Sequence, residues 1–218
     1  MMRIITGTAR GTKLVTLEGD NTRPTAERVK EAVFSMLQFE LEGRAVLDLF
    51  AGSGQMALEA LSRGAARATL IDASREANAV ILENAKKTHL FDRCRISCTD
   101  WASFIRGAAG RETYHIVFLD PPYGDGILPT VLSKLWEAGI LSPGAAIVCE
   151  TAEETAGRQH RRGMSREDVA NEEQAIVLRD VFGDDVTLSE KYTVDRTAAY
   201  GRTRITVLRP GLADTAEV

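Results

Sequence analysis

The chain has 218 residues, of which 44% are hydrophobic and 27% are charged. These proportions are typical of a globular protein with a full apolar core, and they exclude a disordered or fibrous chain. The formal net charge is -4, whereas proteins that attract nucleic acid diffusely are usually basic. Any contact with RNA or DNA must therefore come from a local basic patch.

The cysteines and the termini indicate a cytoplasmic protein. Cys94, Cys98 and Cys149 form no CxxC pair. Cys94 and Cys98 fall on one expected strand, where a rise of ~3.3 Å per residue places them too far apart for a disulfide. Reduced thiols are the expectation. The N-terminus has no apolar signal-peptide core, and no apolar run is long enough to span a membrane.

The N-terminal segment is expected to form a β-hairpin or a loose arm, because short apolar and polar pieces alternate around Gly7 and Gly11. Residues 1–30 contain six basic and three acidic side chains, so this segment carries +3 within a chain of -4. A solvated surface is one interpretation of these charges. The alternative is RNA phosphate contact, for which the candidate residues are Arg10, Lys13, Arg23 and Arg28.

Strands and helices are expected to alternate after a first helix at residues 25–37. Expected strands lie at 45–50, 68–71, 95–99, 115–119 and 145–149, and expected helices at 55–63, 75–89, 101–106 and 127–138. Five such alternations predict an α/β fold, with a parallel sheet covered by helices on both faces.

The pattern changes after Glu150. Residues 151–174 are polar and mixed in charge, which favours a solvated loop or surface helix; a second nucleic-acid contact at Arg161-Arg162 is the alternative. Residues 175–182, 186–192 and 199–208 alternate like antiparallel strands, with a turn at Gly183-Asp184.

A glycine-rich turn, Ala51-Gly52-Ser53-Gly54, follows the first expected strand. Glycines let the backbone approach a ligand closely. The run Gly52–Ala57 also fits the loose dinucleotide pattern G-x-G-x-x-G/A, so an NAD-dependent oxidoreductase is an alternative. Asp48 favours a cationic ligand, because a carboxylate accepts hydrogen bonds from an ammonium group and repels a pyrophosphate.

Acids also end the next three strands, at Asp72, Asp100 and Asp120. A carboxylate after the second strand suits a ribose diol, although a helix N-cap is the other interpretation of Asp72. An acid after the third strand suits an adenine amino group. These acids at neighbouring strand ends fit S-adenosyl-L-methionine, a cationic ligand that carries a ribose. The predicted cofactor-binding residues are Asp48, Phe50, Gly52, Ser53, Gly54, Asp72, Ala73, Asp100 and Trp101.

The motif Asp120-Pro121-Pro122-Tyr123 stands at the carboxyl end of the fourth expected strand, where ligands bind in open α/β sheets. An exocyclic amine of a nucleobase is a poor nucleophile, because its lone pair is conjugated with the ring. The Asp120 carboxylate and the Pro121 carbonyl can accept the amine hydrogens, and the prolines stiffen the turn. The Tyr123 ring can stack on a flipped base, worth about 1–3 kcal/mol. We therefore predict catalysis by Asp120, Pro121, Pro122 and Tyr123 without a metal; a merely rigid turn is the alternative.

The two motifs Asp48–Gly54 and Asp120–Tyr123 together resemble class I S-adenosylmethionine-dependent amino-methyltransferases. Further segments are similar to the bacterial RsmD family, which methylates guanine N2 in 16S ribosomal RNA: Arg3-Ile4-Ile5, Arg10-Gly11, Lys13-Leu14, Thr22–Thr25, Arg28–Glu31 with Phe34, and Leu58–Gly64. The resemblance implies a Rossmann-like, mostly parallel seven-stranded sheet with an antiparallel last strand, and an N-terminal β-hairpin that helps to hold RNA.

The resemblance covers residues 3–150 well, and residues 151–185 look like an insertion. It implies a hairpin arm at 1–21, a methyltransferase domain at 22–210 and a tail at 211–218. The implied partner of a monomeric protein is 16S rRNA or a small-subunit ribosomal particle. The alternatives are a methyltransferase of adenine N6 or cytosine N4 in DNA or other RNA, and a non-catalytic RNA-binding protein.

Overall fold

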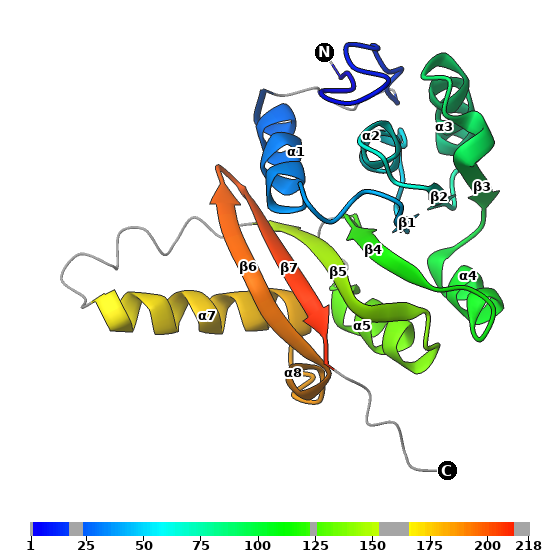
Figure 1. Cartoon of the computed structure of the whole chain (residues 1–218). Coiled ribbons are helices and arrows are strands. Elements are labelled where there is room, and N and C mark those ends of the chain that lie inside the picture. The colour runs from blue at the N-terminus through cyan, green and yellow to red at the C-terminus, as the bar shows by residue number, and fades with distance from the viewer. Residues whose placement is uncertain (1, 18–23, 123–125, 153–165, 212–218) are drawn as a thin grey trace.

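The computed structural model describes residues 2–17, 24–122, 126–152 and 166–211, without the side chains of residues 24–26 and 166–173. Its centre is a seven-stranded sheet in the order β3-β2-β1-β4-β5-β7-β6 (Figure 1). The strands are β1 (Ala45–Asp48), β2 (Arg67–Asp72), β3 (Cys94–Cys98), β4 (Tyr114–Leu119), β5 (Leu141–Ala152), β6 (Tyr192–Tyr200) and β7 (Thr203–Pro210).

The strand directions confirm the predicted sheet. Strands β1 to β5 pair in parallel, and β7 pairs antiparallel with both β5 and β6. Asp48, the last residue of β1, pairs with Leu70 of β2 and with Phe118 of β4. The carboxyl ends of these three strands therefore meet at one edge of the sheet, and this edge carries the predicted acids.

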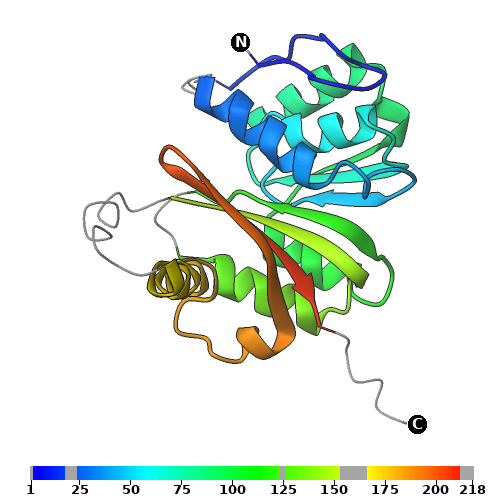
Figure 2. The same ribbon diagram turned by 60° about the vertical axis from the view of Figure 1, so that its left-hand side comes forward.

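Helices cover both faces of the sheet, each over its own apolar core (Figure 2). One face is covered by α1 (Pro24–Met36), α2 (Gln55–Ser62) and α3 (Arg75–Lys87), and a short 3-10 helix η1 (Phe91–Arg93) precedes β3. The other face is covered by α4 (Trp101–Ala108), α5 (Leu128–Glu137), α7 (Arg166–Phe182) and α8 (Leu188–Lys191). None of the described helices combines the length and the apolarity needed to cross a membrane.

The N-terminal segment, residues 2–17, is docked on the body of the protein. A single antiparallel bridge joins Arg3 with Lys13, so the hairpin is short. Gly7 has a φ of 87°, and a Cβ there would lie 1.8 Å from the carbonyl oxygen of Ser62, at the end of α2. Only glycine permits so close an approach of two backbones. Of the two predicted forms, a short hairpin therefore describes this segment and a loose arm does not.

The C-terminal region differs from the prediction. Residues 175–182 are the end of helix α7 and not a strand. Their buried side chains are Val177, Val181 and Phe182, a spacing that places them on one face of a helix. The predicted strand at 186–192 is also wrong, because α8 occupies Leu188–Lys191 and β6 begins at Tyr192, whose hydroxyl donates to the Leu132 carbonyl at 2.8 Å.

Candidate active site

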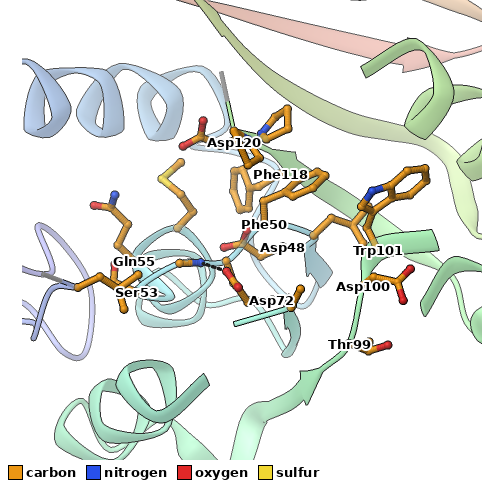
Figure 3. Close-up of a pocket in the computed structure, with 18 of the residues that line it drawn as sticks. Asp48, Phe50, Ser53, Gln55, Asp72, Thr99, Asp100, Trp101, Phe118 and Asp120 are labelled. Carbon is orange, nitrogen blue, oxygen red and sulfur yellow. Dashed lines mark hydrogen bonds between the residues drawn. The ribbon is translucent and has the colours of Figure 1, made fainter. Parts of the chain in front are cut away.

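A cavity of about 600 Å³ opens at the carboxyl edge of the sheet (Figure 3). Its lining includes predicted residues of both motifs and of the ends of the second and third strands: Asp48, Phe50, Gly52, Ser53, Asp72, Ala73, Asp100, Trp101, Asp120, Pro121 and Pro122. The glycine-rich turn and the Asp120 motif therefore belong to one site, although almost 70 residues separate them in the sequence. Tyr123 lies outside the described residues.

Asp48 forms the floor of the cavity. Its side chain is 3% exposed, and its Oδ2 is buried without a hydrogen-bond partner among the described residues. Burial, together with a smaller contribution from the nearby Asp72, raises the pKa of this carboxyl to about 7, although backbone N–H groups of Ala57 and Phe50 lower it. A buried acceptor without a donor is costly, so a cationic donor entering the cavity would stabilise it.

Asp72 holds the glycine-rich turn in place. Its Oδ2 accepts a hydrogen bond from the Gly52 N–H at 2.9 Å (Figure 3). Its Oδ1 accepts one from the Ser74 N–H at 2.9 Å. The N-cap of α3 is Ser74, whose Oγ accepts from the Ala77 N–H. The helix N-cap interpretation of Asp72 is therefore wrong. Each carboxylate oxygen keeps a second lone pair, and the cavity wall presents these to a ligand.

Gly54 is placed behind the turn and does not contribute to the cavity wall. It is the N-cap of α2 with a φ of 78°, a conformation that favours glycine. A Cβ at this position would lie 3.1 Å from Leu70 Cδ2 and 3.4 Å from Ile81 Cγ2. Gly54 thus lets the turn pack closely on β2 and α3, and its contribution to a bound cofactor would be indirect.

Asp100 and Trp101 border the cavity at the start of α4. Asp100 is the N-cap of this helix and accepts a hydrogen bond from the Ser103 N–H at 2.9 Å. This bond holds the pKa of the exposed Asp100 below its usual value. Trp101 and Phe50 are half-buried and pack on the core of that face, while both reach the cavity. They offer apolar ring surface beside an acid.

Asp120 and the two prolines border the cavity immediately after β4. Asp120 and Pro122 are exposed, whereas Pro121 is buried. Phe118, two residues earlier, also lines the cavity and packs on Phe34 of α1, with ring centroids 5.8 Å apart. The motif thus extends from a strand that is fixed by core packing, which is how a fold holds an acceptor at a constant position.

The N-terminal segment supplies part of the cavity wall through Met2 and Leu17. The Ser53 hydroxyl donates to Met2 Sδ at 3.1 Å. The fully buried Asn84 of α3 joins the segment to the glycine-rich turn: its Nδ2 donates to the carbonyls of Val15 and Ser53, both at 2.9 Å, and its Oδ1 accepts from Val15 N–H at 2.8 Å. The docked segment and the turn therefore share one support.

Glu59 of α2 is the main anchor of the N-terminal segment. It is fully buried and accepts hydrogen bonds from the N–H groups of Ile5 and Thr6 and from Arg63 Nε, at 2.7 to 3.0 Å. Lys30 Nζ lies 3.9 Å away. Lys30 is 3% exposed, burial lowers its pKa, and it donates to the Arg3 carbonyl at 2.6 Å. Lys30 is therefore a structural residue and not part of an exposed basic surface.

The predicted RNA-binding residues are placed as follows. Arg10, Lys13 and Arg28 are exposed, and no hydrogen bond or ion pair holds their side chains within the described part of the chain. Arg23 lies outside the described residues. Arg3, which the charge count includes, is paired with Glu27 at 2.8 Å. Three exposed cations therefore remain on the N-terminal side of the molecule as candidates for phosphate contact.

Several residues of the site were missed in the sequence. Thr99, Gln55, Met56 and Ile127 also line the cavity. Gln55 and Met56 occupy variable positions of the run Gly52–Ala57, and Thr99 and Ile127 belong to no motif that would have identified them. Glu59 and Asn84 do carry a signal, because each is a polar residue at an inward position of an amphipathic helix. Polar groups at such positions are usually hydrogen-bonded to something that the fold must bring to them.

Solved structures share this architecture. The yhhF protein of Escherichia coli, described as a candidate methyltransferase, superposes with a TM-score of 0.72 at 27% identity, covering 97% of this chain and 99% of that chain. An O-methyltransferase from Bacillus cereus in complex with SAH has a TM-score of 0.62 at 12% identity, covering 89% and 84%, which is a likeness of fold alone. The fold and the cavity define a class I S-adenosylmethionine-dependent methyltransferase, and the oxidoreductase alternative is wrong.

Sequence relatives identify the family within this class. Ribosomal RNA small subunit methyltransferase D from Escherichia coli (strain K12) is 37% identical over 150 residues, 69% of this chain and 74% of the relative. The protein of the same name from Haemophilus influenzae is 32% identical over 151 residues, 69% and 78%. Residues 2–177 match the model of the family Conserved hypothetical protein 95. The chain belongs to this family and is an RsmD-like methyltransferase.

Proposed function

We propose that this protein transfers a methyl group from S-adenosyl-L-methionine to the exocyclic N2 amine of a guanine in 16S ribosomal RNA. The observation that carries the proposal is that the Asp120-Pro121-Pro122 turn borders the same cavity that has the buried Asp48 as its floor. The names of the relatives, which specify ribosomal RNA of the small subunit, support the choice of substrate.

The residues of the cavity fit this cofactor. The Asp48 Oδ2, buried without a partner among the described residues, would accept a hydrogen bond from the ammonium group. Asp72 would accept the ribose hydroxyls and Asp100 the adenine amino group, with Phe50 and Trp101 providing apolar surface. When bound, S-adenosyl-L-methionine supplies a methyl group on a sulfonium that carries a positive charge.

The chemistry left to the protein is the activation of the amine. The guanine N2 lone pair is conjugated with the ring, so the nitrogen must become pyramidal before it can attack. The Asp120 carboxylate and the Pro121 carbonyl would accept its two hydrogens and stabilise the positive charge that develops. A stacking role for the Tyr123 ring against the flipped base stays a prediction.

Contact with RNA would come from the N-terminal side. Arg10, Lys13 and Arg28 are exposed on a chain whose net charge is -4, so they offer the local patch that the overall charge requires. The segment that carries Arg10 and Lys13 also supplies Met2 and Leu17 to the cavity wall. RNA held there would therefore lie close to the cofactor.

The experiment that tests this function begins with small-subunit particles and 16S rRNA from a strain that lacks the gene. Mass spectrometry of nuclease fragments should reveal one N2-methylguanine that is missing compared with the parent strain. Purified protein with methyl-labelled S-adenosylmethionine should restore it, and an Asp120→Ala variant should not. Label in adenine N6, in cytosine N4 or only in DNA would contradict the proposal.

A further inference from the structure

Strands β5, β6 and β7 extend past the end of β4 at the carboxyl edge of the sheet. The last residue of β4, Leu119, pairs with Cys149 of β5, whereas β5 continues to Ala152, which pairs with Thr203 of β7. The strand from Cys149 to Ala152 adds about 10 Å at about 3.3 Å per residue. The paired strands β6 and β7 therefore project on one side of the turn that carries Asp120.

The tip of the β6–β7 hairpin, residues 200–203, has the sequence Tyr-Gly-Arg-Thr. Tyr200 pairs with Thr203, and Gly201 has the positive φ, 68°, that a two-residue hairpin turn requires at its first position. Tyr200 is half-buried and packs on the same apolar core as Phe118, two residues before Asp120. One core therefore supports both the tyrosine ring and the strand that carries Asp120.

The strand order places the hairpin tip close to the reactive turn. β4, β5, β7 and β6 are successive neighbours in the sheet. Three spacings of about 4.8 Å separate β4 from β6, a distance of about 15 Å. An RNA strand whose target base meets Asp120 can therefore reach Tyr200 within a few nucleotides.

The start of α1 lies beside the hairpin tip (Figures 1 and 2). Arg196 of β6 donates to the carbonyl of Met36, at the end of α1, at 2.7 Å. From this contact, α1 leads back eight residues to Arg28, about 12 Å along the helix, and β6 leads on four residues to Tyr200, about 13 Å along the strand. Both directions lead towards the carboxyl edge, so Arg28 and the hairpin tip lie on the same side of the active site.

Exposed cations at this edge provide an independent observation. Arg28 and Arg202 are exposed, and no hydrogen bond or ion pair holds either side chain within the described part of the chain. The candidate active site is lined by acids, which would repel the phosphates of an RNA strand. A strand that brings a base to Asp120 therefore needs cations beside the cavity, and these two arginines are placed there.

We propose that the hairpin tip binds the RNA strand beside the target guanine, with Tyr200 stacking on a neighbouring base and Arg202, together with Arg28, contacting phosphates. This inference rests on the proposed function and adds to it a second RNA-binding surface, separate from the N-terminal segment. Enzymes that act on a flipped base also contact the nucleotides that flank it. Because any base can stack on an aromatic ring, this surface would hold the strand without reading its sequence.

The test measures methyl transfer to small-subunit particles from the strain that lacks the gene. Tyr200→Leu should raise KM for the particle about fivefold or more, the effect of one lost stacked base, and should leave kcat within about twofold. Tyr200→Phe keeps the ring and should behave as wild type. An unchanged KM in Tyr200→Leu, or an equal rise in Tyr200→Phe, would overturn the stacking role.

Arg202→Ala tests the phosphate contact and provides a second route if Tyr200→Leu does not fold. KM for the particle should rise several-fold at low salt, and its dependence on log salt should become shallower by about 0.7, the share of one phosphate in a single strand. Arg111→Ala, at an exposed arginine that precedes β4 at the opposite edge of the sheet, should change neither quantity. An unaltered slope in Arg202→Ala, or the same change in Arg111→Ala, would contradict the contact.

Photo-crosslinking identifies the molecule that occupies the surface. The protein with p-benzoylphenylalanine in place of Tyr200, irradiated with the particle, should crosslink to 16S rRNA at nucleotides adjoining the methylated guanine. A crosslink to a ribosomal protein, or only to RNA remote from that guanine, would overturn this inference and leave the proposed function intact. Absence of N2 methylation by the wild-type protein would instead overturn the proposed function itself.

Discussion

Two cavities lie at the carboxyl edge of the sheet: that of the candidate active site, and a second one of about 230 Å³ whose lining includes Pro121, Pro122 and Thr151. They differ in the buried atom that each leaves without a partner among the described residues. In the first cavity this atom is a carboxylate oxygen of Asp48, and in the second it is the hydroxyl oxygen of Thr151. A buried carboxylate calls for a cation, whereas a hydroxyl is satisfied by a neutral polar group. The contrast indicates that the first cavity suits a cationic ligand, whereas water or any neutral polar group would satisfy the hydroxyl in the second.

The supports of the two cavities differ as well. Behind the first, the buried side chains of Glu59 and Asn84 and the carboxylate of Asp72 bond to backbone groups of other elements, and so fix the turn and the N-terminal segment. Pro121, Pro122 and Ile127 line both cavities, and the two proline rings restrict the backbone where the cavities adjoin. The first cavity is thus supported by a network of hydrogen bonds, and its border with the second by a stiff turn.

The largest expected effect follows from breaking the network at Glu59. Glu59→Ala leaves two backbone N–H groups and Arg63 Nε without their acceptor, and it removes the negative charge beside the buried Lys30. We expect the free energy of unfolding to fall by about 3–5 kcal/mol in urea titrations. Glu83→Ala, at an exposed carboxylate of α3, should change it by less than about 0.5 kcal/mol. A loss below about 1 kcal/mol for Glu59→Ala would show that the network is not an anchor.

A smaller effect is expected at the turn itself. Asp72→Ala removes the acceptor of the Gly52 N–H and, on our account, of the ribose hydroxyls. The dissociation constant for S-adenosylmethionine, measured by calorimetry, should rise about 10- to 100-fold, as for a lost hydrogen bond to a charged group. Asp92→Ala, in the exposed 3-10 helix, is the matched control. An unchanged constant in Asp72→Ala would remove this residue from the site.

The charge of Asp48 gives a pH dependence with a defined sign. Its pKa is about 7 in the folded protein and about 4 in an unfolded chain, so the folded state holds the proton more tightly between these values. The free protein should therefore lose stability as pH rises from 4 to 7. A cationic ligand prefers the carboxylate, so its affinity should rise over the same window, by at most tenfold per pH unit.

Calorimetry in two buffers of different ionisation enthalpy measures the linked proton directly. Binding of S-adenosylmethionine near pH 6.5 should release a proton from the wild-type protein, and Asp48→Asn should abolish this release. If wild type and Asp48→Asn release the same number of protons, Asp48 is not the group that meets the ammonium.

The smallest effect concerns the exposed cations of the N-terminal segment. Replacing Arg10 and Lys13 with Ala should weaken RNA binding several-fold at low salt. The slope of log affinity against log salt should become shallower by about 1.5, since each phosphate contact contributes about 0.7–0.9. Cofactor affinity should not change. An unaltered slope would show that these side chains do not contact phosphates.

The sequence predicted the repeating part of the molecule well, because its signals are local. Buried strands that end in an acid or a glycine turn gave the sheet, the cavity edge and most of the residues that line it. The same reasoning mistook the helix ending at Phe182 for a strand, because short apolar runs such as residues 175–182 fit the periodicity of a helix as well as that of a strand. Only the packing of Val177, Val181 and Phe182 on the core decides between them.

The parts of the site that could not be predicted depend on contacts between distant segments. Asn84 acquires its role by touching Val15 and Ser53, which lie 69 and 31 residues away. Glu59 acquires its role by accepting from the N–H groups of Ile5 and Thr6, which lie 54 and 53 residues away. Buried polar residues such as these can be noticed in a sequence, but their partners follow from the tertiary fold.

The most direct test of our central claim, that Asp120 acts on the amine and not on the cofactor, is the variant Asp120→Ala. Cofactor binding and methyl transfer are measured in parallel. Our account predicts that the dissociation constant for S-adenosylmethionine stays within about twofold of wild type. The turnover rate on small-subunit particles should fall about 10²–10³-fold, as for loss of one acceptor that stabilises developing charge. Near-normal turnover, or a loss of cofactor binding as large as the loss of rate, would contradict the account.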